Sequence, residues 1–341
     1  MSSSKLEFID RSDIDWQTFI ATQEQANIFH HADWSQLMQE CYGYRPFVIA
    51  LRDSNGTICA GLPMMEISRH RWVSLPFSDH CAPLSADSAA LKKLTEELTL
   101  KAHEPGVPKM EMRWDLSNQI QSKSSSEFVL HTIQLDNAFE TTEARIHHSH
   151  RRNIKNAQAH GIQIKLGRSL EDVRAFYLLH LQTRHRQGMP IQPYHFFELL
   201  HKRLIDKGLG FVLLAYKEEQ CLAGAVFLHW KHTLTYKYGA STLADLHLRP
   251  NHLIFWNAIQ WGCDHGYTRL DLGRSSIENI GLREFKSRWG AQEKLLFYTS
   301  FPSEPIHAPD HHIVEMMRVV IQKSPTWVCR LSGELLYKHF G

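Results

Sequence analysis

Strand-like runs occur in two groups in this sequence, one on each side of a polar, serine-rich stretch at residues 117–127. The first group consists of residues 45–51, 57–67 and 72–75, and the second of residues 211–216, 220–229 and 234–240. Turns at residues 53–56 and 217–219 separate the first two runs of each group. Short apolar or alternating runs joined by tight turns are typical of antiparallel strands. The sequence therefore predicts two sheets, one in each half of the chain.

Segments with apolar residues at helical spacing surround both groups. They are residues 13–25, 33–40 and 86–103 in the first half, and residues 141–160, 170–187, 193–207 and 250–262 in the second half. Further strand-like runs are residues 109–116, 128–135, 162–166 and 267–272. Because a similar order of elements occurs twice, we expect an α/β protein with two tandem domains, at residues 1–125 and 126–302.

The last residues differ in character from both halves. Three prolines form a spacer, and residues 310–323 and 332–340 then have the pattern of two short helices. Arg318, Lys323, Arg330 and Lys338 lie in or beside their apolar runs. We expect residues 303–341 to be a helical tail, and two interpretations of it stay open: packing against the protein, or contact with a membrane surface.

Composition excludes several classes of function. Lys plus Arg number 38 and Asp plus Glu 36, so the net charge of +2 gives no bulk reason to expect DNA or membrane binding. The six cysteines contain no C-x-x-C pair and the 23 histidines no H-E-x-x-H, so we expect neither disulfides nor a metal site. No signal peptide and no apolar run of membrane-spanning length is present, which favours the cytoplasm, with the inner face of the membrane left open.

One long segment of the second half carries a recognisable signature. LRPNHLIFWNAIQWGCDHGYTRLDLGRS is followed by GLREFKSRWGA, which gives a helix, a G-x-x-x-x-D-x-G strand end and a G-L-x-x-F-K-x-x-W-G segment. Its positions are Gly266, Asp271, Gly273, Gly281, Leu282, Phe285, Lys286, Trp289 and Gly290. This pattern resembles the FemAB-like acyl- and aminoacyltransferases of the GNAT superfamily. Residues 75–84, 149–161, 176–197 and 236–241 resemble further segments of that family in the same order.

The resemblance implies two GNAT-like domains, each with a mixed, mainly antiparallel sheet flanked by helices. It also implies transfer of an aminoacyl or acyl group to an amine of a peptidoglycan or exopolysaccharide precursor. The co-substrate would be aminoacyl-tRNA or acyl-CoA, with no tightly bound cofactor, and tRNA is an open partner. An acyl-CoA-dependent N-acetyltransferase acting on a small molecule, and a GNAT-fold module that only binds, remain alternatives.

Four residues are candidates for the chemistry. Asp271 lies on the strand face opposite the leucines, next to Gly273, where a backbone can approach a ligand closely. Asp79 and His80 follow a strand and a proline, where a loop could offer a proton acceptor to an amine. Tyr238 could donate a hydrogen bond to a developing oxyanion. Simpler roles stay open: turn capping for the two aspartates, and a half-buried strand aromatic for Tyr238.

A second set of residues is a candidate for binding the co-substrate. Phe285, Lys286 and Arg288 place cations beside aromatic side chains, and we expect Lys286 to be an exposed cation facing a ligand. In the predicted helix at residues 141–160, a basic stripe of Arg145, His148, Arg152 and Lys155 would suit phosphates. An ordinary solvated helix face is the alternative. No [RQ]-x-x-G-x-[GA] pyrophosphate loop is found, which favours a donor other than acetyl-CoA.

Overall fold

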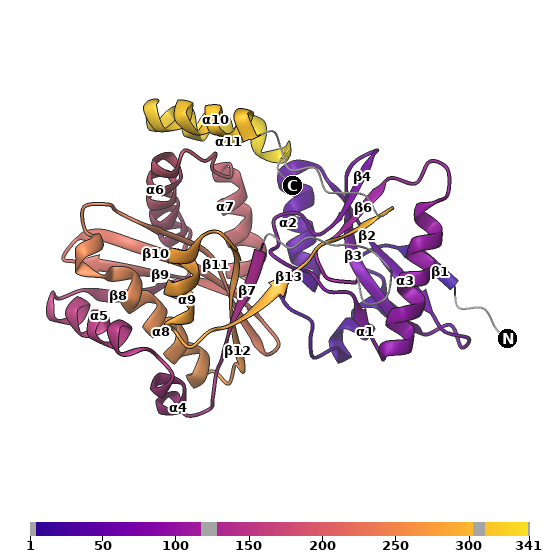
Figure 1. The fold of residues 1–341 in the computed structure, drawn as a ribbon, viewed down its shortest axis with the longest axis horizontal. Helices are drawn as coiled ribbons and strands as arrows, with labels where there is room; N and C mark the ends of the chain where they lie inside the picture. Colours follow the sequence, from indigo (N-terminus) through magenta and orange to yellow (C-terminus); the bar gives the residue numbers. More distant parts are fainter. Residues whose placement is uncertain (1–4, 117–127, 303–310, 340–341) are drawn as a thin grey trace.

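The computed structural model describes residues 5–116, 128–302 and 311–339. In this part of the chain, two α/β units lie side by side, and a pair of helices lies across the second unit (Figure 1). Each unit has a mixed sheet flanked by helices, so the predicted fold class is confirmed. The predicted boundary at residues 125 and 126 lies outside the described residues, and the domain limits stay a prediction.

The sheet of the first unit has the strand order β1-β2-β3-β4-β6-β14, with β5 paired to β3. Its strands are β1 (Lys5–Ile9), β2 (Arg45–Arg52), β3 (Ile58–Ser68), β4 (Arg71–Ser74), β5 (Leu84–Ser85), β6 (Lys109–Met112) and β14 (Thr299–Phe301). All pairs are antiparallel except β4 with β6. Strand β14 brings the chain back to the first sheet after the second unit is complete.

The sheet of the second unit has the order β13-β7-β12-β11-β10-β9-β8. Its strands are β7 (Phe128–Gln134), β8 (Gln163–Gly167), β9 (Gly210–Lys217), β10 (Gln220–Trp230), β11 (Thr233–Ser241), β12 (Arg269–Ser276) and β13 (Gln292–Leu296). The single parallel pair, β11 with β12, joins Thr233, Leu234 and Thr235 to Arg269, Leu270 and Asp271. The two strands are paired at these residues and not beyond them, so they separate after Thr235 and Asp271.

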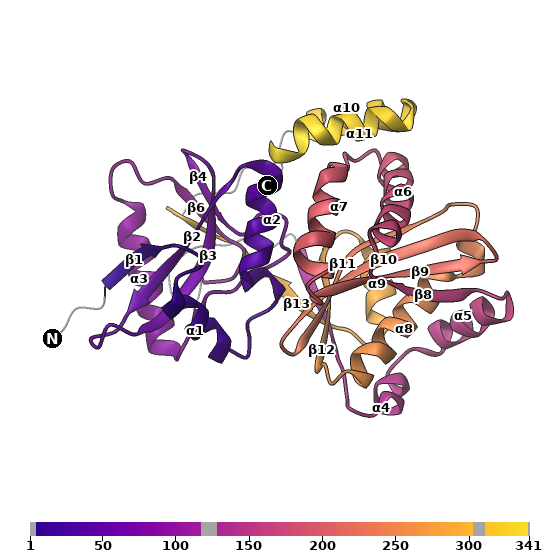
Figure 2. The same cartoon turned by 180° about the vertical axis from the view of Figure 1, so that it is seen from behind.

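Helices cover both faces of the sheets (Figure 2). The first unit contributes α1 (Ile14–Thr22), η1 (Ile28–His30), α2 (Ala32–Tyr42) and α3 (Ser88–Ala102). The second contributes α4 (Phe139–Ala144), α5 (His148–Ala159), α6 (Leu170–Gln187), α7 (Tyr194–Leu200), η2 (His201–Ile205), η3 (Leu246–Leu248), α8 (Pro250–Asp264) and α9 (Ile280–Ser287). The tail forms α10 (His311–Lys323), α11 (Thr326–Leu336) and η4 (Tyr337–His339).

A single buried apolar cluster joins the two units and the tail. It contains Trp34 and Leu37 from α2, Phe176 and Phe197 from α6 and α7, and Cys329 from α11. Interfaces between domains allow relative motion unless they are large and hydrophobic. Because this core is continuous across the interface, side chains from the two units can be held at fixed distances from each other.

The basic stripe predicted for one long helix is wrong as a continuous feature. The chain forms two helices there, and Arg145 is the C-cap of α4, ion-paired to Asp136. The break is a local one, because His147 starts α5 as a new N-cap whose imidazole accepts the N–H of Ser149. Apolar spacing alone could not reveal this interruption, since polar residues dominate both helices.

Candidate active site

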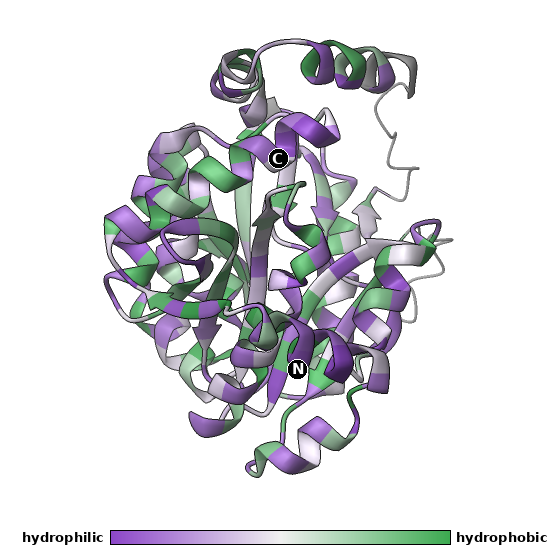
Figure 3. Ribbon diagram, turned by 90° about the vertical axis from the view of Figure 1, so that its left-hand side faces the viewer, coloured by the Kyte–Doolittle hydropathy of each residue, from purple (hydrophilic) through white to green (hydrophobic). Residues whose placement is uncertain are grey.

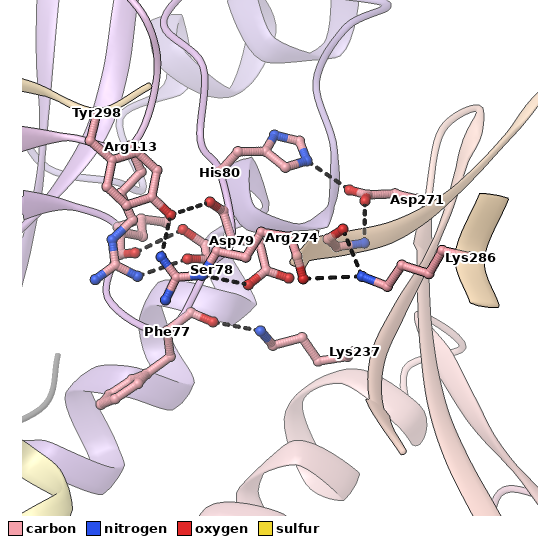
Figure 4. Close-up of polar contacts among 12 residues, drawn as sticks. Phe77, Ser78, Asp79, His80, Arg113, Lys237, Asp271, Arg274, Lys286 and Tyr298 are labelled. Atoms are coloured by element: carbon pink, nitrogen blue, oxygen red, sulfur yellow. Dashed lines mark hydrogen bonds and ion pairs between the residues drawn. The ribbon is translucent and has the colours of Figure 1, made fainter. Parts of the chain in front are cut away.

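A loop of the first unit reaches the second sheet where β11 and β12 separate (Figure 4). The loop residues Phe77, Ser78 and Asp79 each have a carbonyl oxygen that accepts a hydrogen bond from a side chain. The donors are Lys237 Nζ at 2.5 Å, Arg113 Nη1 at 2.7 Å and the Tyr298 hydroxyl at 2.6 Å, respectively. Phe77 has a left-handed backbone with φ of 59°, which is uncommon for a bulky residue and requires support from its surroundings. The loop is thus fixed residue by residue.

His80 and Asp271 form a pair across the two units. His80 Nε2 lies 2.6 Å from Asp271 Oδ2, and their side chains are 13% and 4% exposed. Asp271 Oδ1 also accepts the backbone N–H of Gly273 at 2.7 Å. Burial works against protonation of His80, but the charge and hydrogen bond of Asp271 outweigh it and raise the pKa of His80. Asp271 therefore both caps its own turn and orients His80.

The carboxylate of Asp79 lies among three cations of the second unit, Lys237, Arg274 and Lys286. Its side chain is 28% exposed, and Oδ1 lies 3.7 Å from Arg274 Nε. Burial opposes the charge of Asp79, but Lys237, Arg274 and Lys286 outweigh it and lower the pKa of the carboxyl. Asp79 is accordingly ionised at neutral pH, with its charge facing the second unit.

Gly273 gives Asp79 the space for this position. The glycine has φ of +68°, and a Cβ built on it would lie 2.3 Å from Asp79 Oδ2. Any side chain at this position would therefore displace the carboxylate. The pairing of β12 with β7 shifts register between Asp271 and Arg274, so Gly273 sits in a bulge, as is common beside functional sites.

Lys286 is buried, which corrects the expectation of an exposed cation. Its residue exposure is 4%, and Nζ donates to the carbonyl oxygens of Gly273 and Arg274, both at 3.0 Å. An ammonium has three N–H donors, so one remains for another acceptor. Burial lowers the pKa of Lys286 to about 8, despite the opposing charges of Asp79 and Asp271. The lysine thus braces the bulge of β12 and keeps a positive charge beside Asp79.

Lys237 is the extra residue of a second bulge. In the β10–β11 ladder, Val226 pairs with Tyr238 and Phe227 with Tyr236, which leaves Lys237 unpaired. Its ammonium lies 5.4 Å from the ring centres of both Phe29 and Trp34. Burial lowers the pKa of Lys237, and the charge of Asp79 offsets part of this effect.

The structure brings four of the predicted residues together, namely Asp79, His80, Asp271 and Lys286. Tyr238 lies apart from this hydrogen-bond network, with its ring against Phe196, Phe197 and His180. Its hydroxyl is buried and makes no hydrogen bond within the described ranges. A role for Tyr238 as an oxyanion donor stays a prediction.

The other predicted binding residues lie elsewhere in the second unit. Arg152 and Lys155 are exposed on α5, and Arg288 is ion-paired to Glu284 on the surface. The Phe285 ring packs against His150 and Trp289 in a buried aromatic cluster. These residues do not form one site with Asp79, and their role in binding the co-substrate stays a prediction.

A cavity of about 290 Å³ adjoins the network. Trp114, Leu130 and Lys294 are among its lining residues, and the Trp114 ring centre is 5.9 Å from that of His80. A wider hollow of about 520 Å³ lies by β1, away from these residues. No group of three His, Cys, Asp or Glu side chains suited to a metal ion occurs in residues 5–116, 128–302 and 311–339.

Sequence reasoning missed Lys237, Arg274, Arg113 and Tyr298 as parts of the site. Arg274 follows Gly273 directly within the signature, and a lysine between two tyrosines on a strand was a usable signal for Lys237. Arg113 and Tyr298 gave no comparable signal, because each acts on the backbone of a distant loop.

Comparison with known proteins agrees with this architecture. Residues 144–287 match the acetyltransferase (GNAT) domain family. A search of curated proteins finds no match.

Solved structures are similar over nearly the whole chain. FemX has a TM-score of 0.66 and 13% identity, over 92% of this chain and all (100%) of FemX. L-PGS from Bacillus licheniformis has a TM-score of 0.56 and 13% identity, covering 93% and 98% of the two chains. A tandem GNAT protein from the clavulanic acid biosynthesis pathway has a TM-score of 0.53 and 9% identity, covering 89% and 100%. At such identities the likeness establishes the fold. The chain therefore has the fold of these structures, with two GNAT-like units, and residues 144–287 match the acetyltransferase (GNAT) domain family.

Proposed function

We propose that this protein transfers an aminoacyl or acyl group from an activated ester or thioester to a primary amine. The observation that carries the proposal is the meeting of Asp79 with Lys237, Arg274 and Lys286 where β11 and β12 separate. Beyond Thr235 and Asp271 the two strands are not paired with each other, and the groups around this point carry opposite charges. Attack of an amine on a carbonyl develops positive charge on nitrogen and negative charge on oxygen. A site with a carboxylate and several cations can stabilise both charges.

The charge balance of the site favours binding of an anion. His80 and Asp271 offset each other, and Arg113 is paired to Glu111. Lys237, Arg274 and Lys286 remain beside Asp79, and Asp271 also acts on the two lysines, so positive charge still exceeds negative charge in largely buried surroundings. An oxyanion formed during transfer would gain from that excess, by an amount on the order of 10²–10³-fold in rate for one donor.

In the proposed reaction, the amine nitrogen forms a bond to the carbonyl carbon, and the bond to the leaving oxygen or sulfur breaks. Asp79, ionised and partly exposed, receives the amine and accepts its proton. Lys286 points its free N–H at the carbonyl oxygen as negative charge develops. His80, held by Asp271, orients the loop that carries Asp79. Asp79 gives the proton that it took from the amine to the leaving oxygen or sulfur, so the carboxylate is ionised again when the transfer is complete.

Two donor classes fit the proposal. The match to an acetyltransferase domain supports acyl-CoA, whereas the FemAB-like fold and the absence of the usual pyrophosphate loop support aminoacyl-tRNA. For the acceptor we propose an amine on a cell-envelope precursor, in line with the FemAB-like resemblance, and with the reaction in the cytoplasm.

A donor screen tests the proposal. Purified protein is incubated with single aminoacyl-tRNAs or acyl-CoAs and envelope-type amine acceptors, and amide products are detected by mass spectrometry. Asp79→Asn is the matched control, because it keeps the shape of the side chain and removes its charge. The expected result is an amide with one donor class, formed faster as the acceptor ammonium deprotonates. No amide with any donor would leave a GNAT-fold binding module as the function, whereas equal yields from the variant would remove Asp79 from the proposed reaction.

A further inference from the structure

The two tail helices carry apolar side chains on the face turned away from the protein. Six large apolar residues of α10 and α11 are between 40% and 64% exposed: Met316, Val319, Val320, Trp327, Leu331 and Leu335. In α11 they follow at intervals of four residues, and in α10 at intervals of three and one, so each set forms one stripe. Figure 3 shows the two helices at the top of the molecule, forming its outer layer there.

The opposite faces of both helices are fixed to the protein. Ile321 and Cys329 are buried in the core that joins the units. A Cβ on Gly333 would lie 1.7 Å from the carbonyl oxygen of Ile191, and one on Gly188 would lie 2.5 Å from the Arg318 backbone oxygen. These close approaches hold the helices firmly in place. The outward stripes are consequently a stable surface of the folded protein, here called the tail face.

The tail also carries exposed cations. The two helices and η4 carry Arg318, Lys323, Arg330 and Lys338, against Glu315 and Glu334. Each glutamate is ion-paired to an arginine of its own helix, so the lysines supply the excess charge. Exposed apolar residues together with Lys and Arg are the pattern of helices that lie in a membrane interface.

Helix length decides between lying on a membrane and crossing it. With 13 and 11 residues, each helix is about 20 Å long or shorter at 1.5 Å per residue, whereas the hydrocarbon core of a bilayer is about 30 Å thick. A search of the described ranges finds no helix with the length and apolar character of a membrane span.

Charge decides between a membrane and a second copy of the chain. In a twofold dimer the same patch meets itself, so this contact would bring the cations of two tails together and would be opposed by like-charge repulsion. An anionic lipid surface is complementary to both features, since its hydrocarbon can contact the apolar stripes and its headgroups can pair with the cations. We propose that the tail face binds the surface of a membrane that contains anionic lipid.

This binding would place the candidate site in a defined position relative to the membrane. Tyr337, at the end of α11, has its ring centre 5.1 Å from that of Phe77, and the Phe77 carbonyl accepts from Lys237. The Tyr44 hydroxyl donates to the Lys338 carbonyl. The tail therefore touches the loop that carries Asp79, and the inference goes beyond the proposed transfer reaction without requiring it.

Vesicle flotation with the full chain tests the inference without any donor or acceptor. Vesicles of phosphatidylcholine alone are compared with vesicles that also contain phosphatidylglycerol. The test variant is Trp327→Glu with Leu331→Glu, and the matched control is Ile14→Glu with Leu100→Glu, which changes apolar residues of α1 and α3 that are at least as exposed. All four positions are exposed, so unchanged melting temperatures are expected and serve as the folding check.

We expect the wild type and the control to float with the anionic vesicles. The tail variant should lose at least about tenfold in partitioning, because charges replace two apolar contacts. Lys323→Gln with Lys338→Gln should weaken binding at low salt by about fivefold to thirtyfold, since each lysine near an anionic surface contributes on the order of 1 kcal/mol. Absence of flotation, equal flotation of tail variant and control, or equal binding to neutral vesicles would overturn the proposal. A stable dimer that the tail variant converts to monomer, without vesicle binding, would assign the face to a second copy.

Discussion

Replacement of Gly273 by alanine tests whether the position of Asp79 is required for activity. A Cβ on Gly273 would lie 2.3 Å from Asp79 Oδ2, so the carboxylate must move by about 1 Å or more to restore ordinary contact. The left-handed backbone adds a strain of roughly 1–2 kcal/mol for a non-glycine residue. Moving the carboxylate should lower the free energy of unfolding by about 1–3 kcal/mol more, the range seen when extra atoms are forced into a packed site.

Gly266→Ala is the matched control for this change. Gly266 has φ of +72°, against +68° at Gly273, and nothing lies within 4 Å of its added Cβ. It should show the backbone strain alone, a fall in melting temperature of about 2–8 °C at roughly 2–4 °C per kcal/mol. The melting temperature of Gly273→Ala should be lower than that of Gly266→Ala by a further 2–12 °C or about that, on the same scale.

Activity should separate the two variants more strongly than stability does. Transfer should drop by about 10²-fold or more in Gly273→Ala, because misplacement by 1 Å disrupts positioning, and stay near the wild-type rate in Gly266→Ala. Equal activity of the two glycine variants would refute the reasoning, as would equal melting temperatures.

Three further substitutions test the charges of the site. Lys286→Met should lower turnover about 10²–10³-fold. Because burial lowers the pKa of Lys286 to about 8, the unfolded chain binds this proton more tightly, so the wild type should gain stability relative to the variant as pH rises from about 8 to 10.5 in thermal melts. Asp271→Asn should remove stability that is fully present below about pH 6.5 and is lost as pH rises through the raised pKa of His80, and melts between pH 5.5 and 9 would measure this; parallel curves would contradict the pairing. Arg152→Ala should raise the KM for a phosphate-bearing donor by a factor that shrinks with salt, since exposed charges are screened; a salt-independent factor would remove α5 from the binding surface.

Much of the fold could be predicted because its signals are local. Alternating runs with turns at residues 53–56 and 217–219 marked the hairpins β2–β3 and β9–β10. Strands β1 and β14 were missed, because they are short edge or returning strands whose partners lie far along the chain. Glycine and proline are unfavourable inside strands, yet Gly61 and Pro63 both lie inside β3, since tertiary pairing with β2 outweighs the weak local preference.

The site was only partly predictable because its contacts are long-range. His80 and Asp271 are 191 residues apart in the sequence, and neither segment contains a pattern that predicts their contact. Signature residues were found, but the environment of Lys286 was misjudged, because a lysine in an amphipathic helix is usually solvated. Its burial follows from the bulge at Gly273. A bulge is a shift in the register of two paired strands, and one sequence alone does not reveal such a shift.

The bulges of β11 and β12 explain why cations gather at this point at all. In a regular ladder, successive side chains alternate between the two faces of a sheet, so Lys237 would point to the face opposite that of Tyr236 and Tyr238. The backbone carbonyls of β12 would then be hydrogen-bonded to neighbouring strands. The bulges instead leave Lys237 unpaired and free the Gly273 and Arg274 carbonyls to accept from Lys286. A buried lysine needs such acceptors, because an unpaired buried charge is costly. The charge at this site therefore depends on irregularities in neighbouring ladders of one sheet: β11 and β12 separate beyond Thr235 and Asp271, and the bulge of β12 supplies the backbone oxygens that hold Lys286.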